Sequence, residues 1–421
     1  MSGDEWHDIF PFMPNKHIVL ASQCSALLSA IAQRYLCHAH WKKEGLIPTA
    51  EKSGLKGVKY LVERCGVDVH TENYDALRFA SRNGYLDVVK YLVLECGADV
   101  EARNNFGQNA LQLASLGGHV QLVRFLVEEG GADVHARKEC ALQYASKYGR
   151  LEVVRYLVEV GGADVHAGCE YALRLASTSG HLDVVRYLVK NRGTDVHAWG
   201  DCALLWASDK GHVQVVKYLV LECGADVHAR DEFALQLASR NGHLEVVKFL
   251  VHECGADVHA DDEEALQRAS ERGHLEVVKY LVEKGADVHA RKWNGDDALR
   301  CASENGHLEI VRYLVKERGA NVHAQDEEAL RFSSARGQLQ VVKYIVLECG
   351  SDVRVCGDNG NNALHEACEN GRLEVVKYLV EEAGIDEHAR NKNNENALDV
   401  AIRYDHLKVV KYLLHQKAHF F

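Results

Sequence analysis

The hydrophobic positions of this chain follow one helical pattern that returns many times. In the segment HLEVVKYLVEK, residues 274–284, the side chains of Leu275, Val278, Leu281 and Val282 share one helical face, and charged residues occupy the opposite face. A helix this short and this apolar is not stable alone in water, so it must pack against neighbours. Near-copies occur at steps of 31, 33 or 34 residues. The pattern therefore predicts an array of repeats.

Each repeat is predicted to hold two short helices. The first resembles ALQRAS, residues 265–270, and Gly273 can end it in a left-handed conformation. The second helix follows, and the segment GADVHA leads to the next repeat. An Ala-Leu pair marks the start of eleven repeats, at Ala76, Ala110, Ala141, Ala172, Ala203, Ala234, Ala265, Ala298, Ala329, Ala363 and Ala397. Residues 53–70 are expected to form a half repeat that keeps only the second helix.

The turns before the first helices differ in length. Four repeats with longer turns keep a helix N-cap residue before the Ala, at Asn109, Asp297, Asn362 and Asn396. Five consecutive repeats, starting at Ala141, Ala172, Ala203, Ala234 and Ala265, lack three turn residues. Their cap positions hold Cys140, Tyr171, Cys202, Phe233 and Glu264. We expect shortened hairpins there, and a more open groove along the first helices.

The succession of a Leu-bearing first helix, Gly-His-Leu, Val-Val and Gly-Ala-Asp-Val resembles ankyrin repeats over residues 49–421. The resemblance implies an all-α solenoid of about twelve helix-turn-helix units, with short and partly truncated hairpin loops. It also implies a non-catalytic scaffold that binds a partner protein along its concave surface. The Thr-Pro-Leu-His opening common in that family is missing, and its His remains only at His365. The style of the array is similar to arrays of giant DNA viruses and some fungi.

Aromatic residues in the central repeats are the first candidates for partner binding. Aromatic side chains on a recognition surface commonly supply most of the binding energy. The candidates are Tyr171, Trp199, Trp206 and Phe233. Trp206 takes the position that Leu175 and Leu237 hold in neighbouring repeats, which favours a core role, whereas Trp199 lies in a turn and is expected to be exposed.

Acidic residues near the cap positions are the second candidates. Asp261, Asp262, Glu263 and Glu264 form one run, and residues 326–328 form another. Such runs along one edge could hold a basic partner segment, and an ordinary solvated edge is the alternative.

Histidines recur at fixed spacing, yet the spacing does not suit a metal. His135, His166, His197, His228 and His259 stand 31 residues apart. Stacked helices lie roughly 8–10 Å apart, whereas zinc–nitrogen bonds measure about 2.0–2.1 Å. We therefore expect structural histidines and no metal. The motifs GxSxG, GxxxxGK[ST] and HExxH are absent, so we expect no catalytic residues, no cofactor and no enzyme.

Residues 1–44 do not repeat and are expected to form a small helical domain, separate from the repeat domain of residues 49–421. This segment resembles an F-box, through positions that include Ile9, Phe10, Phe12, Ile18 and Trp41. The resemblance implies docking on the adaptor of a cullin-RING ubiquitin ligase, which would make the chain a substrate receptor. The alternative is a helical cap on the end of the array. A third possibility is a repeat-based inhibitor that occludes a partner's active site.

Composition narrows the location and the partners. The net charge of −12 opposes binding to nucleic acid. No apolar run is long enough to span a membrane. The acidic start MSGDEWHD differs from a signal peptide, so we expect an intracellular, cytoplasmic protein, with the nucleus as the alternative. Cysteines such as Cys65, Cys96 and Cys254 are expected to be small buried thiols, and the chain a monomer.

Overall fold

The computed structural model describes residues 46–70, 75–292 and 295–418. The expected docking residues Ile9, Phe10, Phe12, Ile18 and Trp41 lie outside this part of the chain. The chain divides into two compact blocks, an N-terminal block of residues Met1–Trp199 and a C-terminal block of residues Gly200–Phe421.

All regular elements in the described ranges are helices, and they alternate between two kinds. The first helices of the repeats are α5 (Asp75–Asn83), α7 (Ala110–Gly117), α9 (Ala136–Lys147), α11 (Ala167–Thr178), α13 (Ala198–Asp209), α15 (Ala229–Arg240), α17 (Ala260–Arg272), α19 (Ala298–Glu304), α21 (Ala324–Arg336), α23 (Ala363–Glu369) and α25 (Ala397–Arg403).

The second helices follow them. They are α6 (Leu86–Lys90) with η3 (Tyr91–Glu95), α8 (Val120–Glu128), α10 (Leu151–Glu159), α12 (Leu182–Arg186) with η4 (Tyr187–Asn191), α14 (Val213–Leu221), α16 (Leu244–Lys248) with η5 (Phe249–Glu253), α18 (Leu275–Glu283), α20 (Leu308–Arg312) with η6 (Tyr313–Glu317), α22 (Leu339–Leu347), α24 (Leu373–Glu381) and α26 (Leu407–Ala418).

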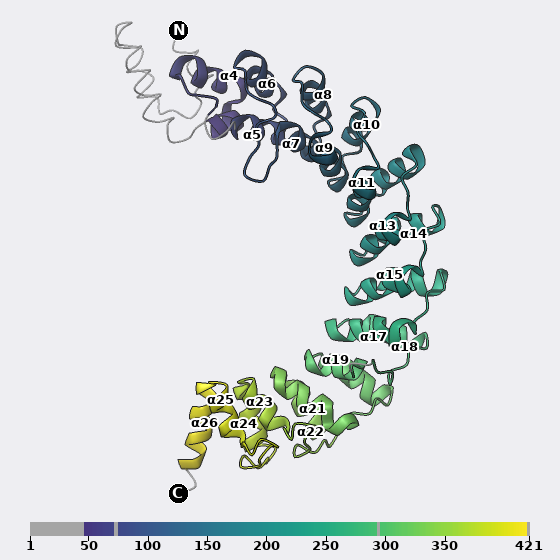
Figure 1. Ribbon diagram of the computed structural model, residues 1–421, viewed down its shortest axis with the longest axis vertical. Helices are drawn as coiled ribbons and strands as arrows, with labels where there is room; N and C mark the ends of the chain where they lie inside the picture. Colours follow the sequence, from purple (N-terminus) through teal and green to yellow (C-terminus); the bar gives the residue numbers. More distant parts are fainter. Residues whose placement is uncertain (1–45, 71–74, 293–294, 419–421) are drawn as a thin grey trace. The chain divides into compact units, whose positions relative to one another are not determined.

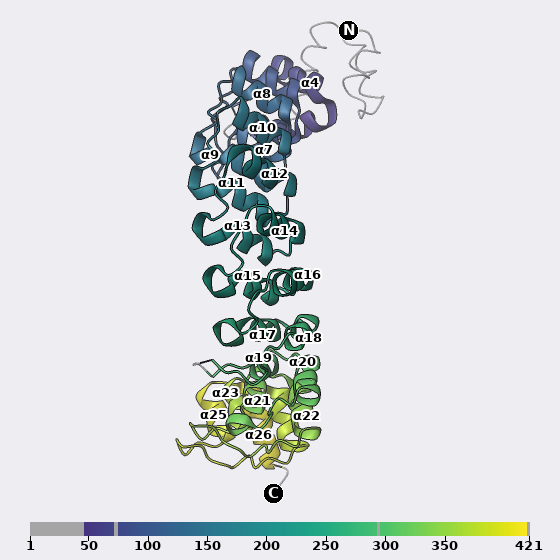
Figure 2. The same cartoon turned by 90° about the vertical axis from the view of Figure 1, so that its right-hand side faces the viewer.

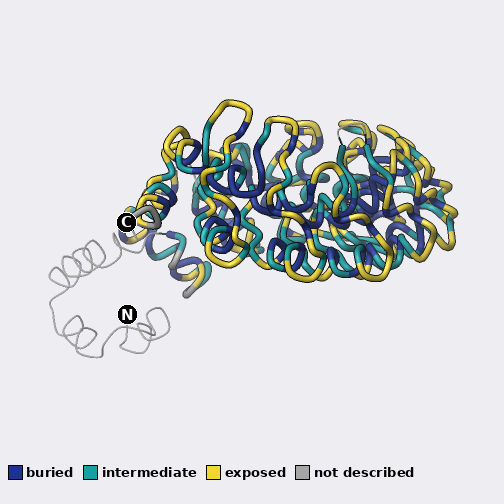
Figure 3. The backbone as a smooth tube through the Cα atoms, turned by 90° about the horizontal axis from the view of Figure 1, so that it is seen from below, coloured by how far each residue is buried: buried dark blue, intermediate teal, exposed yellow. Residues whose placement is uncertain are grey.

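Within each block the helices form two layers. First helices pack on first helices of the neighbouring repeats, and second helices pack on second helices (Figures 1 and 2). Buried residues lie between the layers and exposed residues lie at the turns (Figure 3). The repeated Val-Val pair, such as Val153 and Val154, is fully buried. The predicted repeats of two helices are therefore confirmed.

The expectation of a half repeat at residues 53–70 is wrong. Helix α4 (Leu46–Cys65) is kinked at Gly54, which has φ 57° and ψ −147°. Leu46 and Ala50, which precede the kink, are buried. Residues before Gly54 thus supply a short first helix, because a turn with a positive φ at glycine separates them from the second helix.

A hydrogen bond between neighbouring repeats explains the histidine that begins most second helices. His119 Nε2 lies 3.0 Å from the carbonyl oxygen of Arg82, one repeat earlier. The same contact recurs at His181, His243, His274, His307 and His406. Where another residue takes this place, it still donates to the equivalent carbonyl, as at Arg150, Gln338 and Arg372. This histidine series is therefore structural.

The glycine that follows the first helix of the preceding repeat makes room for that ring. A Cβ atom on Gly242 would lie 2.4 Å from Nδ1 of His274, and Gly242 has a φ of +76°. Only glycine fits both the left-handed backbone and the close approach. Gly242 and His274 thus form one contact between two consecutive repeats.

The longer turns have the predicted N-caps. Asn109 Oδ1 accepts the backbone N–H of Gln112, whose side chain accepts the N–H of Asn109 in return. Asn362 and Asn396 form the same capping box, and Asp297 accepts the N–H of Arg300.

The short turns are not the hairpins that we expected. In their place, three successive residues with positive φ join directly onto the first helix, as at Arg137, Lys138 and Glu139 with φ of 54°, 59° and 65°. The left-handed turns lie at residues 137–139, 168–170, 199–201, 230–232, 261–263 and 325–327. The last belongs to the repeat at Ala329, which makes six short turns rather than five. One left-handed turn of three residues therefore leads into the first helix in the repeats that lack the longer turn.

A side chain on the first helix closes most of these turns. Gln143 Nε2 donates to the carbonyl oxygen of Lys138 at 2.6 Å. Gln236 and Gln267 donate in the same way to Asp231 and Asp262, and arginine does so at Arg174 and Arg331.

The third residue of each left-handed turn is a buried carboxylate. These residues are Glu139, Glu170, Asp201, Glu232, Glu263 and Glu327. Glu232 Oε1 accepts a hydrogen bond from His228 Nδ1 at 2.5 Å and from the backbone N–H of Asp257, in the next repeat, at 3.2 Å. These six acidic side chains are buried although glutamate and aspartate are usually exposed, and those like Glu232 accept hydrogen bonds both within their own repeat and from the next one.

Replacing Lys138 by glycine should stabilise the protein. A non-glycine residue in the left-handed region costs about 1–2 kcal/mol, and the greater freedom of glycine in the unfolded chain offsets about half of this. We expect Lys138→Gly to raise the free energy of unfolding by about 0.5–1 kcal/mol in urea unfolding. Lys138→Ala keeps the positive φ and is the control, and an equal gain from alanine would contradict the assignment of strain.

Candidate partner-binding surface

Within each block, the predicted aromatic residues lie in the turns or on the first helices. Trp199 stands in a left-handed turn and is 60% exposed, so its predicted exposure is confirmed. Tyr171, in helix α11 of the N-terminal block, is 38% exposed. Both rings belong to the N-terminal block and come from consecutive repeats.

The guanidinium group of Arg174 joins these two rings. Its central carbon lies 4.9 Å from the ring centroid of Tyr171 and 4.8 Å from that of Trp199. Its Nη2 donates to the carbonyl oxygen of Gly168 at 3.1 Å, which holds the side chain against the turn. A guanidinium over an aromatic face contributes about 0.5–1 kcal/mol at exposed sites. Tyr171, Arg174 and Trp199 therefore form a preformed cluster, which we name the aromatic clamp.

Glu170 positions both sides of the aromatic clamp. It precedes Tyr171 directly and is buried. Its Oε1 atom lies 2.8 Å from His166 Nδ1 and 3.3 Å from the backbone N–H of Asp195, in the loop that leads to Trp199. One carboxylate thus ties the turn that carries Tyr171 to the segment that carries Trp199.

This hydrogen bond also changes the protonation of His166. The bond to Glu170 raises the pKa of His166, desolvation opposes the rise, and the charges of Glu170 and Asp164 add to it. Glu139, Glu232 and Glu263 raise the pKa of His135, His228 and His259 in the same way. These His–Glu pairs explain why a histidine recurs every 31 residues beside the short turns, as at His135, His166, His228 and His259.

The other two candidate aromatics belong to the C-terminal block. Phe233 is 37% exposed. Trp206 is 44% exposed, so the interpretation that favoured a core role is wrong. Leu175 and Leu237 at the same position are only half-buried, and the larger indole extends past the neighbouring side chains into solvent.

The predicted acidic edge is only partly present. Asp261 and Asp262 are exposed, whereas Glu263 and Glu264 are buried and cannot contact a partner. Glu264 lies 2.7 Å from Arg268 Nε and pairs with Lys292, so its charge is neutralised within the repeats. In the second run Glu327 is buried as well. The sequence does not reveal the ion pair of Glu264 with Lys292, because that cation comes from the turn of the following repeat.

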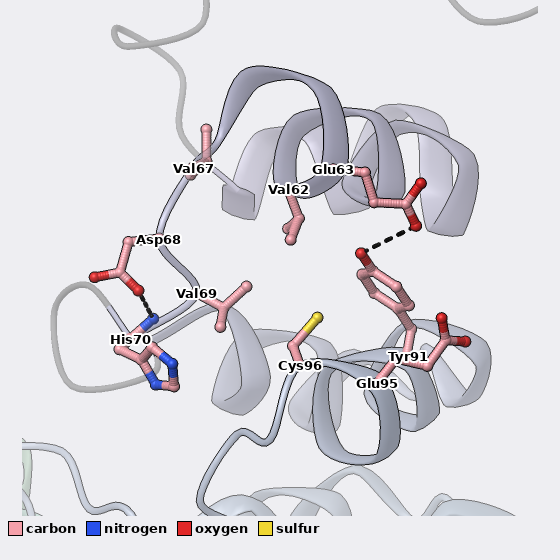
Figure 4. Close-up of a pocket in the computed structure, with 9 residues that line it drawn as sticks. All are labelled: Val62, Glu63, Val67, Asp68, Val69, His70, Tyr91, Glu95 and Cys96. Atoms are coloured by element: carbon pink, nitrogen blue, oxygen red, sulfur yellow. Dashed lines mark hydrogen bonds between the residues drawn. The ribbon is translucent and has the colours of Figure 1, made fainter.

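An open recess lies between helix α4 and η3 (Figure 4). The hydroxyl of Tyr91 donates to Glu63 Oε1 at 3.3 Å, and the ammonium group of Lys59 lies 4.7 Å from the Tyr91 ring. Burial raises the pKa of the Cys96 thiol, so this thiol is not an activated nucleophile. The side chains of Tyr91 and Cys96 are hydrogen-bonded to each other, and Tyr344 and Cys349 form the same pair in a later repeat. The recess is therefore a feature of repeat packing, and it contains no activated nucleophile.

The other cysteines vary in burial. Cys65 is buried as expected, but Cys96 and Cys254 are only partly buried, which corrects the expectation for these two. In the described ranges no group of three or more His, Cys, Asp or Glu residues could hold a metal ion. No helix in the same ranges is long and apolar enough to cross a membrane.

Sequence reasoning found Tyr171 and Trp199 but missed Arg174 and Glu170, which assemble them. One signal was present in the sequence. An acidic residue recurs every 31 residues, whereas the residues next to it differ between repeats: Glu139, Glu170, Asp201, Glu232 and Glu263.

Comparison with known proteins gives one family match. A family model described as ankyrin repeats (3 copies) matches residues 20–104, 93–169, 161–231, 233–326 and 330–420. No curated protein matches the chain.

The His166–Glu170 pair should make stability depend on pH. The raised pKa of His166 in the folded state means that the ion pair stabilises the fold fully below the unfolded pKa of about 6.5. This stabilisation is lost as the pH rises through the raised pKa. We expect His166→Gln, which keeps a hydrogen-bond donor, to lower the midpoint of thermal unfolding more at pH 6 than at pH 8.

Two further measurements complete this test. The imidazole of His166 should titrate above pH 6.5 by NMR, and that of His274, whose pKa burial lowers, should titrate below it. An equal effect of His166→Gln at both pH values would show that the pair is not charged in the folded protein.

Proposed function

Because the chain belongs to the ankyrin-repeat family, we propose that it is a non-catalytic scaffold that binds a partner protein through its turns and first helices. Ankyrin repeats indicate protein–protein interaction. The described surface supports this through exposed aromatic rings at the turns rather than through a cleft with reactive groups.

The aromatic clamp is the observation that carries the proposal. Two exposed rings from consecutive repeats are held in place by one arginine, and a buried carboxylate fixes both turns. Tyr, Trp and Arg are the residues most enriched among binding hot spots. Because the three side chains are already ordered in the free protein, they lose little conformational entropy when a partner binds. The clamp is therefore the place where we expect the largest part of the binding energy.

Truncation of the aromatic clamp should abolish most of the binding. We expect Trp199→Ala to weaken the affinity for a partner by about 2 kcal/mol or more, about 30-fold, and Tyr171→Ala to act in the same direction. The partner is first recovered by affinity capture and mass spectrometry with the full chain. Its affinity for each variant is then measured with purified proteins by calorimetry.

Matched controls separate binding from folding. Leu94 and Val160 are exposed apolar residues on the other side of the N-terminal block, in or beside second helices. Leu94→Ala and Val160→Ala should leave the affinity unchanged. If they weaken binding as much as Trp199→Ala does, with unchanged circular dichroism, the partner uses another face and this proposal is wrong.

Two finer functions remain distinct proposals. A repeat-based inhibitor would use the same surface, and the captured partner would then be an enzyme whose activity falls when the chain binds. A substrate receptor of a cullin-RING ubiquitin ligase would instead need the F-box-like segment, which rests on the sequence of residues 1–44 alone.

The receptor function can be tested separately from substrate binding. If it is correct, the full chain co-purifies with a ligase adaptor and a cullin from eukaryotic lysate, and the triple variant Ile9→Ala, Phe10→Ala and Phe12→Ala does not. The Trp199→Ala variant should retain the adaptor while it loses the partner. Absence of adaptor with the wild-type chain argues against the receptor function and leaves the scaffold unaffected.

A further inference from the structure

We propose that the turns and first helices of the repeats at Ala203, Ala234 and Ala265 bind a basic segment of a partner protein that also carries apolar residues. The inference rests on the proposed scaffold function and adds a second contact surface, in the C-terminal block, together with the chemistry of its ligand. Two observations carry it: an exposed apolar patch, and an excess of negative charge around that patch.

The apolar patch consists of Trp206 in α13 and of Phe233 and Leu237 in α15, and we name it the Trp206 patch. Trp206 is 44% exposed, Phe233 is 37% exposed, and Leu237 is half-buried. Phe233 and Leu237 are four residues apart, so they share one face of α15. Leu237 holds the position of Trp206 one repeat later. Asn241 Nδ2 donates to Asp209 Oδ1 at 2.8 Å, which joins the two repeats side by side.

The repeats do not need large rings at these positions for their packing. Leu237 takes the place of Trp206 in the next repeat, and Cys202 and Glu264 take the place of Phe233 in the two adjacent repeats. The first helices form in all of them. The exposed parts of the two rings are therefore available to a ligand, and aromatic anchors commonly provide most of the binding energy of an interface.

Negative charge exceeds positive charge on the same side of these three repeats. Residues 200–211, 225–242 and 256–273 form the turns and first helices there, and they contain eleven carboxylates and five Lys or Arg side chains. The carboxylates are Asp201, Asp209, Asp226, Asp231, Glu232, Asp257, Asp261, Asp262, Glu263, Glu264 and Glu271. The cations are Lys210, Arg230, Arg240, Arg268 and Arg272.

Histidines and the following turn reduce this excess without removing it. A hydrogen bond to the buried glutamate of the same turn raises the pKa of His228 and of His259, so these imidazoles add at most two positive charges. Lys292, from the turn of the next repeat, pairs with Glu264 and lies 4.0 Å from Asp261. With all three counted, eleven carboxylates still stand against eight cations.

Three of the five Lys and Arg side chains are paired with carboxylates of this side. Lys210 lies 2.9 Å from Asp209. Arg268 and Arg272 lie 3.3 and 3.9 Å from Glu271. These cations are therefore neutralised where they stand.

The carboxylates outside these pairs are concentrated at the surface of the turns. Arg230 and Arg240 are the other two cations of this side. Asp231 lies two residues before Phe233, and helices α15 and α17 pack side by side, so the turns that precede both helices border the Trp206 patch (Figures 1 and 2). Five carboxylates are exposed in these turns: Asp226, Asp231, Asp257, Asp261 and Asp262.

The second helices of the same repeats are nearly balanced in charge. Residues 212–224, 243–255 and 274–285 contain five carboxylates and four Lys side chains. Most of them are paired, at 3.2, 2.9 and 3.3 Å in the pairs Lys217–Glu253, Lys248–Glu245 and Lys279–Glu276. The excess of negative charge is therefore specific to the side that carries the Trp206 patch.

A basic segment with apolar residues fits both observations. The face of an indole ring attracts the ammonium group of Lys and the guanidinium group of Arg, and exposed carboxylates nearby attract the same groups. Apolar side chains of the segment can pack on Phe233 and Leu237, which removes apolar surface from water. Nucleic acid would be repelled by the exposed carboxylates. The complementarity therefore favours a protein segment that combines Lys or Arg with apolar residues.

Peptide selection on the full chain tests this inference. Random linear peptides on phage are selected on the wild-type protein, and enriched peptides are synthesised for affinity measurements. Peptides of the Trp206 patch are identified by a loss of at least about tenfold in affinity for Trp206→Leu. This variant should keep its fold, because Leu237 occupies the same position in the next repeat. We expect these peptides to combine Lys or Arg with apolar residues and to bind more weakly as salt rises.

Charge reversal in two turns tests the charge of the ligand. The triple variant Asp231→Lys, Asp261→Arg and Asp262→Lys should lower the affinity for these peptides by at least about tenfold. Arg137 and Lys138 already occupy the same two turn positions with φ of 54° and 59°, so the turns of the variant should form and its circular dichroism should be unchanged.

A second triple variant gives an equal change of net charge on the second-helix side. Glu222→Lys, Glu253→Lys and Glu283→Lys place the new cations at or near the C-terminal ends of second helices, where positive charge is tolerated well. The affinity for the peptides should stay within about twofold of wild type. An equal loss in both triple variants would show that only the net charge of the chain matters, and the inference would be wrong.

Other results would overturn the inference as well. These are the absence of any enriched peptide that responds to Trp206→Leu, responsive peptides that are neutral or acidic, and full affinity in the first triple variant. Peptides of Lys and Arg that bind Trp206→Leu as they bind wild type, with no other peptides enriched, would also overturn it, because charge alone would then be sufficient.

The failure of this inference can be told from a failure of the proposed function. If enriched peptides lose affinity with Trp199→Ala and not with Trp206→Leu, the aromatic clamp binds ligands and only the second surface is wrong. If basic peptides respond to Trp206→Leu while the captured partner binds Trp199→Ala as it binds wild type, the second surface is correct and the aromatic clamp is not the anchor.

Discussion

The structure depends on a carboxylate that is buried at the third position of each short turn. In most of the short turns it accepts a hydrogen bond from the histidine of its own turn and another from the backbone N–H of the following repeat, as at Glu170, Glu232 and Glu263. A buried donor left without its acceptor costs about 1–3 kcal/mol. One side chain therefore closes a left-handed turn and sets the register of two repeats. The accessible side chains of the turn are placed by that constraint.

Much of the fold follows from the sequence because it rests on periodic burial. The Ala-Leu and Val-Val pairs predict which faces of the two helices are buried, and the buried Ala110, Leu111, Val153 and Val154 confirm this. Caps such as Asn109 were predictable as well, since an Asn followed by Gln112 can satisfy two backbone donors that the first turn of a helix leaves unpaired. These features depend on neighbours within one repeat or on identical repeats.

The short turns and the site were harder to predict because they contradict the usual preferences of their residues. Arg137, Lys138 and Glu139 are not residues that favour a positive φ, and glutamate is rarely buried. Arg174 looks like any surface arginine until Trp199, from the next repeat, is placed beside it. The candidate aromatic residues could be found because their positions vary between repeats. Arg174 and Glu170, which hold them, could not, because their contacts cross a repeat boundary.

The hydrogen bond from the histidine that begins a second helix to a carbonyl oxygen of the preceding repeat has an evolutionary consequence. Because donor and acceptor recur at almost every boundary, loss or duplication of one whole repeat by recombination joins surfaces that already match. The length of the array can therefore change between lineages with little penalty in folding. The aromatic clamp does not share this tolerance, because Tyr171 and Trp199 belong to different repeats and one crossover between them separates the pair. Recombination in such a gene would conserve the architecture while it renews the specificity.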